Sequence, residues 1–119
     1  MNPNQSVAPS DWRVHVLCAQ WCGVCRDYRA FVDARQAAAA GAAWVWVDIE
    51  THSDALGELD IDNFPTLMVT EGDAVRFLGA VTPQPEVAER LLASLLSGNR
   101  YSVPTVPGLQ DTVGALRAL

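Results

Sequence analysis

Three cysteines in one short stretch are the residues of this chain whose side chains offer the most chemistry. Cys18, Cys22 and Cys25 follow one another with the spacing Cys-x3-Cys-x2-Cys. A Cys-x-x-Cys pair can form and break a disulfide, and it can also ligate a metal ion, so the pair alone does not separate these two functions. The elements that position the pair decide between them.

The sequence around the Cys22–Cys25 pair predicts that it lies between a strand and a helix. Arg13–Cys18 is β-branched and apolar, which predicts a strand, and the apolar spacing within Gly23–Ala40 follows one face of a helix. Cys22 is therefore expected at or just before a helix N-terminus, where backbone N–H groups and the helix dipole stabilise a thiolate. Because the thiolate is the nucleophile in disulfide exchange, Cys22 is the expected reactive thiol, with Cys25 in reach on the first helical turn.

The rest of the chain predicts one mixed sheet covered by helices. Ala43–Ile49 is apolar on both faces, which is typical of a central parallel strand. Glu71-Gly72-Asp73 predicts a hairpin turn between two further strands. The other predicted elements are strands at Thr66–Thr70 and Ala74–Leu78 and helices at Ser53–Leu59 and Pro83–Leu96. This order predicts an α/β fold with a mixed central sheet of about four strands, βαβ plus ββα, flanked by helices.

The chain has 119 residues, the length of one domain, and the composition changes near both ends. Residues 1–11 are polar and predict a flexible leader. Residues 12–97 contain the predicted strands and form the expected domain. Residues 98–119 are expected to be a C-terminal extension with one more short helix at Leu109–Leu119.

With these elements in place, the chain resembles the thioredoxin-like superfamily. Residues 21–26, Trp-Cys-Gly-Val-Cys-Arg, are similar to the thioredoxin active-site motif. Phe64-Pro65-Thr66 resembles the segment that holds a cis-proline before a strand of that fold, and Gly79 after the hairpin also matches. The resemblance covers about residues 12–97. It implies a thioredoxin fold and a redox-active centre with oxidoreductase activity.

The resemblance also implies a role for each matching residue. Cys22 would attack a substrate disulfide and Cys25 would resolve the mixed disulfide. Pro65 would adopt the cis form, and the backbone of Phe64 would pair with an extended substrate segment. The residues expected to bind substrate around Cys22 are Trp21, Gly23, Val24, Phe64, Pro65 and Gly79. A reductase or another dithiol protein would supply the electrons, without a bound cofactor or metal.

Three departures from the family pattern bear on these expectations. Typical thioredoxins carry a buried Asp six residues before the first cysteine, where this chain has Val16, so a water or another carboxylate such as Asp27 would have to take the proton. The usual Pro between the cysteines is Val24 here, for which we expect a more oxidising couple. The N-terminal strand and helix of full thioredoxins do not fit before residue 12, so the extension is expected to cover the sheet edge they leave exposed.

The cysteines and histidines also allow structural and metal-binding functions. Cys18 is expected to be a small buried hydrophobe. The three-cysteine spacing also resembles the iron–sulfur motif of radical enzymes that use S-adenosylmethionine, but the chain is too short for their barrel. A zinc site with His15 or His52 as fourth ligand is geometrically possible. His15 is more simply a structural histidine within the predicted strand.

Composition limits the partners. The net charge is −6, and the eight basic residues do not cluster, so neither nucleic acid nor an acidic membrane surface is an expected partner. No targeting segment or membrane span is evident, which gives a cytoplasmic location as the expectation. We expect a monomer whose partners are protein disulfides, with roles in electron transport and cell redox homeostasis. The alternative is a redox-regulated protein-binding module with little catalytic activity.

Overall fold

The computed structural model describes residues 11–38 and 41–119. All the strands and helices expected within this range are present, with bounds that shift by a few residues. The strands are β1 (Trp12–Cys18), β2 (Ala43–Asp48), β3 (Thr66–Glu71) and β4 (Ala74–Ala80), and the helices are α1 (Gly23–Ala38), α2 (Ser53–Leu56), α3 (Pro85–Leu96) and α4 (Leu109–Arg117). The predicted leader lies outside the described residues apart from Asp11, and so do the last two residues of the first predicted helix, 39 and 40.

The strands form one mixed sheet in the order β2-β1-β3-β4. β1 pairs with β2 in parallel and with β3 antiparallel, and β3 and β4 form the predicted hairpin. The mixed four-stranded sheet flanked by helices is therefore confirmed. The expectation that the second strand is central is wrong, because β2 lies at an edge and β1 takes a central position.

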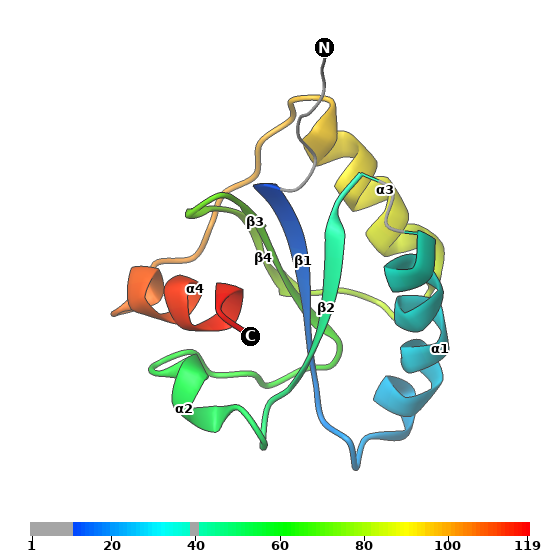
Figure 1. The fold of residues 1–119 in the computed structure, drawn as a ribbon, viewed down its shortest axis with the longest axis horizontal. Helices are drawn as coiled ribbons and strands as arrows, with labels where there is room; N and C mark the ends of the chain where they lie inside the picture. Colours follow the sequence, from blue (N-terminus) through cyan, green and yellow to red (C-terminus); the bar gives the residue numbers. More distant parts are fainter. Residues whose placement is uncertain (1–10, 39–40) are drawn as a thin grey trace.

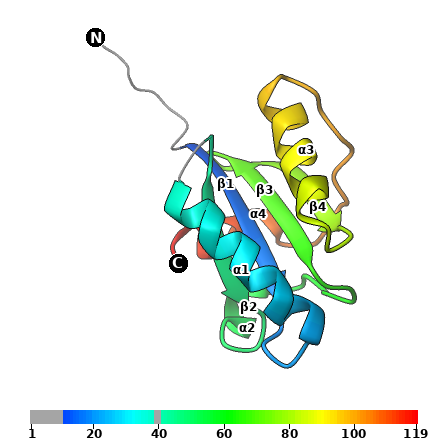
Figure 2. The same ribbon diagram turned by 90° about the vertical axis from the view of Figure 1, so that its right-hand side faces the viewer.

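Helices on both faces of the sheet explain why β2 is apolar on both sides although it is an edge strand. Trp44 and Trp46 belong to or pack against the core between the sheet and helices α1 and α3, whereas Val45 and Val47 belong to or pack against the core on the opposite face. Figures 1 and 2 show α1 and α3 on one side of the sheet and α4 on the other. Coverage of both faces, rather than a central position, accounts for the apolar pattern.

The C-terminal extension completes the second face. Val113 and Leu116 of α4 are buried against Leu17 of β1 and Met68 of β3. We expected the extension to cover a sheet edge, but its helix covers a sheet face instead (Figure 1). None of the helices in the described residues is long and apolar enough to cross a bilayer.

Candidate active site

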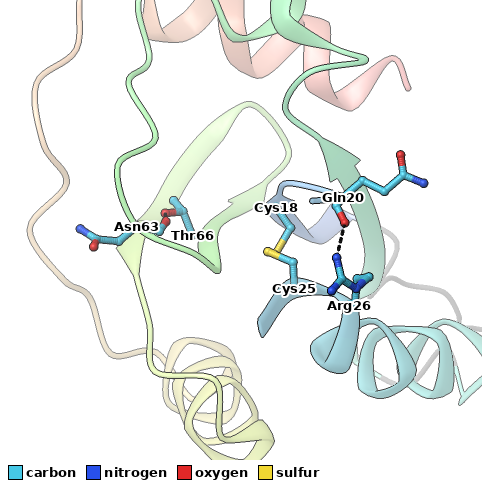
Figure 3. The surroundings of a disulfide bond; sticks show 6 residues. All are labelled: Cys18, Gln20, Cys25, Arg26, Asn63 and Thr66. Atoms are coloured by element: carbon cyan, nitrogen blue, oxygen red, sulfur yellow. Dashed lines mark hydrogen bonds between the residues drawn. A yellow bond between two sulfur atoms is a disulfide. The ribbon is translucent and has the colours of Figure 1, made fainter. Parts of the chain in front are cut away.

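The loop between β1 and α1 places Cys22 at the start of the helix, as the sequence predicts. The Cys22 N–H donates to the Ala19 carbonyl over 3.1 Å, and the Cys22 carbonyl accepts the Arg26 N–H over 3.1 Å, which is the first bond of the helical ladder. The Arg26 side chain donates to the Gln20 carbonyl over 3.3 Å (Figure 3). These bonds hold a short turn in which Cys22 is partly exposed and directly precedes the positive end of a 16-residue helix.

The cysteine pairing differs from the expected one. A disulfide joins Cys18, at the end of β1, to Cys25, in the first turn of α1, with their Cα atoms 5.7 Å apart, and Cys22 is a free thiol (Figure 3). Cys18 is fully buried, as expected of a small hydrophobe, but it is also bonded. The physical reason is strand alternation: Cys18 faces α1 on the same side of β1 as Val14 and Val16, and Cys25 points from α1 into that core.

An aromatic pair of one exposed ring, Trp21, and one partly buried ring, Phe64, lies beside the cysteines. The Trp21 indole is 60% exposed, and its Nε1–H donates to a Glu50 carboxylate oxygen over 2.9 Å. Trp21 and Phe64 meet edge to face, with ring centroids 5.5 Å apart. The predicted cis bond between Phe64 and Pro65 is confirmed. The structure therefore brings together two of the expected substrate-binding residues, Trp21 and Phe64, and Trp21 directly precedes the free thiol Cys22 in the sequence.

The other expected substrate-binding residues lie in different places. Val24 is exposed and lines a hollow of about 230 Å³ together with Tyr28 and Phe31. Gly79 lies in β4 and lines a separate cavity of about 390 Å³, formed with residues 58–63 and 104–107. A Cβ at Gly23 would meet only the far end of the Arg26 side chain, at 3.8 Å, so the site does not require a glycine there.

No buried carboxylate accompanies the disulfide within the described residues. Val16 is fully buried, and the buried polar side chains are those of His15, Thr66, Thr70 and Thr112. Asp27, the carboxylate considered as a substitute proton acceptor, is exposed. Within the described residues, neither position 16 nor Asp27 therefore offers a buried carboxylate to take the proton of Cys25.

His15 has a structural environment. Its Nδ1 lies 3.0 Å from the Met68 carbonyl, so Nδ1–H donates, while Nε2 is buried and has no hydrogen-bond partner among the described residues. Burial lowers the pKa of His15 to about 4, although the hydrogen bond to Met68 works in the opposite direction. His15 is three positions from Cys18 and so on the other face of β1. The described residues contain no group of three His, Cys, Asp or Glu side chains that could hold a metal ion.

Sequence reasoning missed two partners in this site. Glu50 follows the second predicted strand and has the sequence context of a solvated carboxylate, yet it accepts the hydrogen bond from Trp21. The parallel pairing of β1 and β2 was the available signal, because it places the residues after both strands at one edge of the sheet. Cys18, the disulfide partner of Cys25, is the second residue that sequence reasoning missed. The only sequence signal for it is the three-residue spacing between Cys18 and Cys22.

Comparison with known families and structures gives a consistent result. The family model described as Thioredoxin matches residues 4–92. A search of curated protein sequences found no match.

The fold is similar to those of several solved thioredoxins. The oxidised mitochondrial thioredoxin 3 of Saccharomyces cerevisiae is 19% identical, with a TM-score of 0.61 over 71% of this chain and 79% of that one. The germline-specific thioredoxin Deadhead of Drosophila melanogaster is 17% identical, with a TM-score of 0.63 over 73% and 84%. The thioredoxin of Fasciola hepatica is 17% identical, with a TM-score of 0.62 over 71% and 82%. At these identities the likeness is one of fold.

Proposed function

Since the chain belongs to the thioredoxin family, a family of thiol–disulfide oxidoreductases, we propose that it reduces or exchanges disulfides of proteins through Cys22 and Cys25. One observation carries the proposal. Cys22 is a partly exposed free thiol at the start of α1, three residues before a cysteine that is already in a disulfide. Once the disulfide is reduced, Cys22 directly before α1 and Cys25 in its first turn are three positions apart, which suits a nucleophile and a resolving thiol.

The reaction follows from these positions. The Cys22 thiolate attacks one sulfur of a substrate disulfide, which forms a mixed disulfide and releases the first substrate thiolate. The reduced Cys25 then attacks Cys22, which forms the Cys22–Cys25 disulfide and releases the second substrate thiolate. Two electrons pass from the protein to the substrate, and a dithiol donor returns them by the same steps in reverse.

The surface around Cys22 supports a protein substrate. Trp21 and Val24 are among the few large apolar side chains that the described residues leave exposed, and Phe64 packs against Trp21. An extended segment carrying a disulfide can cover these side chains and remove their apolar surface from water. Glu50 accepts a hydrogen bond from the Trp21 indole, so contacts with both Glu50 and Phe64 position this ring before the substrate arrives.

The partners and location follow as parts of the same proposal. The electron donor is a reductase or another dithiol protein, and the protein acts as a monomer in the cytoplasm, in electron transport and cell redox homeostasis. Because that compartment is reducing, cysteine pairs there are more often catalytic, changing between dithiol and disulfide, than permanent structural disulfides.

Reduction of insulin disulfides by dithiothreitol tests the proposal. We expect the wild-type protein to accelerate the reaction and Cys22→Ser to lose the acceleration, because serine does not form the mixed disulfide. Asp73→Asn, in the exposed turn between β3 and β4, is the control and should match the wild type. Equal inactivity of the wild type and Cys22→Ser would contradict the proposal and leave the protein-binding module as the function.

A further inference from the structure

The buried disulfide occupies the cysteine that the proposed reaction needs for its second step. Cys25 is bonded to Cys18, whereas Cys22 is a free thiol. We propose that Cys18 is a third redox-active cysteine, which exchanges with Cys22 for the disulfide bond to Cys25. This inference rests on the proposed function, because it adds a residue to the same cycle.

The geometry puts Cys25 between two possible partners. Cys22 precedes it by three positions, a spacing that brings side chains together on one face of a helix. Cys18 approaches from the end of β1, with a Cα–Cα distance of 5.7 Å that lies within the range a disulfide spans (Figure 3). Cys18 and Cys25 belong to one buried cluster, and Cys22 packs against the same cluster. The sulfur atoms of all three cysteines therefore belong to, or lie against, the same buried cluster.

The step is an internal thiol–disulfide exchange that needs no outside reagent. The Cys18 sulfur, on losing its proton, attacks the sulfur of Cys25 in the Cys22–Cys25 disulfide. A Cys18–Cys25 bond forms, the Cys22–Cys25 bond breaks, and its electron pair leaves on Cys22. The proton lost from Cys18 passes to water or to Cys22, so the number of disulfides and the oxidation state of the protein are unchanged.

Burial gives the exchange a direction. The Cys18–Cys25 disulfide is apolar and lies in an apolar cluster, where it leaves no thiol hydrogen without a partner. Cys22 is released at a partly exposed position directly before α1, where its polar thiol group stays in contact with water. The oxidised protein therefore stores its disulfide inside and keeps a free thiol at the surface.

Burial also makes Cys22 the route by which electrons reach that disulfide. Cys18 and Cys25 are both 0% exposed, so a reductant in solution does not reach either sulfur while the protein is folded. The Cys22 thiolate attacks Cys25 and converts the buried Cys18–Cys25 disulfide into a Cys22–Cys25 disulfide. The Cys22 sulfur of that disulfide is partly exposed, so a donor can reduce it.

Disulfide mapping of the oxidised wild-type protein tests the pairing without any substitution. The protein is quenched in acid, its free thiols are alkylated in denaturant, and chymotrypsin then cuts after Trp21, which separates Cys18 from the other two cysteines. We expect the peptide of Cys18 to stay joined to the peptide of Cys25, with the alkyl group on Cys22. A separate peptide with alkylated Cys18 would overturn the inference.

The rate of reduction tests the route. The Cys22→Ser variant keeps the Cys18–Cys25 disulfide but lacks the thiol that would transfer this disulfide to the surface. We expect dithiothreitol to reduce it at least about 100-fold more slowly than the wild-type disulfide under native conditions, because reduction must wait for local opening. In denaturant the two rates should be equal. Equal reduction rates of the wild type and Cys22→Ser under native conditions would overturn the proposed route through Cys22.

These results separate the inference from the function on which it rests. A Cys22–Cys25 disulfide in the mapping, together with loss of insulin reduction in Cys22→Ser, would remove the role of Cys18 and keep the oxidoreductase. Insulin reduction that persists in Cys22→Ser would remove both.

Discussion

Among single residues, Trp21 shows how an exposed side chain is fixed without being buried. Its indole N–H donates to Glu50, and its ring meets the edge of Phe64. Aromatic pairs of this geometry contribute about 0.5–1.5 kcal/mol beyond the area they bury. Two contacts from different parts of the chain thus hold an apolar surface ready beside Cys22.

Truncation of this side chain should weaken substrate binding. We expect Trp21→Ala to raise the KM for a protein disulfide about 3- to 10-fold, the factor that corresponds to about 0.7–1.4 kcal/mol of lost contact. The measurement is steady-state insulin reduction at several insulin concentrations, with the thermal midpoint as the control for folding. An unchanged KM in a folded variant would show that substrate does not use this surface.

His15 should make the stability of the protein depend on pH. Burial lowers its pKa to about 4 in the folded protein, against about 6.5 in the unfolded chain. Between these values the unfolded chain binds a proton that the folded protein does not, so the free energy of unfolding falls as the pH drops from 6.5 to 4. The lost stability at this one side chain is about 3 kcal/mol at pH 4.

Urea unfolding at pH 7, 5.5 and 4 measures this effect. His15→Gln can still donate to the Met68 carbonyl and does not titrate, so its stability should fall less over this range than that of the wild type. The carboxylates are common to both proteins and cancel in the difference. Parallel losses in the two proteins would show that His15 does not contribute.

At the level of single residues, the sequence predicted part of the site. The positions of Cys22 and Pro65 follow from motifs whose residues are adjacent in the chain, and a helix start follows from the apolar spacing after Cys22. The Cys18–Cys25 bond and the Trp21–Glu50 hydrogen bond depend on how β1, α1 and β2 are packed against one another. No local pattern specifies these distances.

At the scale of elements, α4 is the part whose packing was least expected. It follows a segment with the composition of a loop, yet Val113 and Leu116 are buried in the core on the second face of the sheet. The Arg117 side chain donates to Thr70 of β3 over 2.6 Å, and Arg13 of β1 donates to the Arg117 carbonyl. The extension is therefore packed into the fold as one of its covering helices.

Stability should depend on this helix. We expect Leu116→Ala to lower the free energy of unfolding by about 2–5 kcal/mol, because it removes a fully buried side chain and leaves a cavity. Leu119→Ala, at a side chain that is 48% exposed, is the matched control and should change it by less than about 0.5 kcal/mol. Urea unfolding of both variants is the measurement. Equal effects would contradict the packing of α4 on the sheet.

The position of β2 illustrates what periodicity can and cannot predict. Apolar residues on both faces of β2 led to the prediction of a central strand, whereas they reflect the cores that cover both sides of an edge strand. They did not distinguish a central strand from an edge strand, because strand order depends on pairing and not on side-chain burial alone. The order of elements along the chain, in contrast, predicted the mixed sheet correctly.

For the whole molecule, the fold separates two kinds of task between the two faces of one sheet. Figure 2 shows α1 and α3 on one side of the sheet and α4 on the other. The cysteines belong to or pack against the core under α1 and α3, whereas His15, by strand alternation, faces the side on which the extension completes the core. β1 contributes to both faces through alternate residues. The redox chemistry and much of the supporting core are thus joined through a single central strand.

The central claim is that Cys22 is the thiol that attacks substrate, and trapping tests it most directly. Reduced Cys25→Ser should form a mixed disulfide with insulin that persists, because serine does not resolve it. Mass spectrometry of the adduct should place the insulin chain on Cys22, and the double variant Cys22→Ser/Cys25→Ser should form none. An insulin chain attached to Cys18, or no adduct in folded Cys25→Ser, would contradict the account.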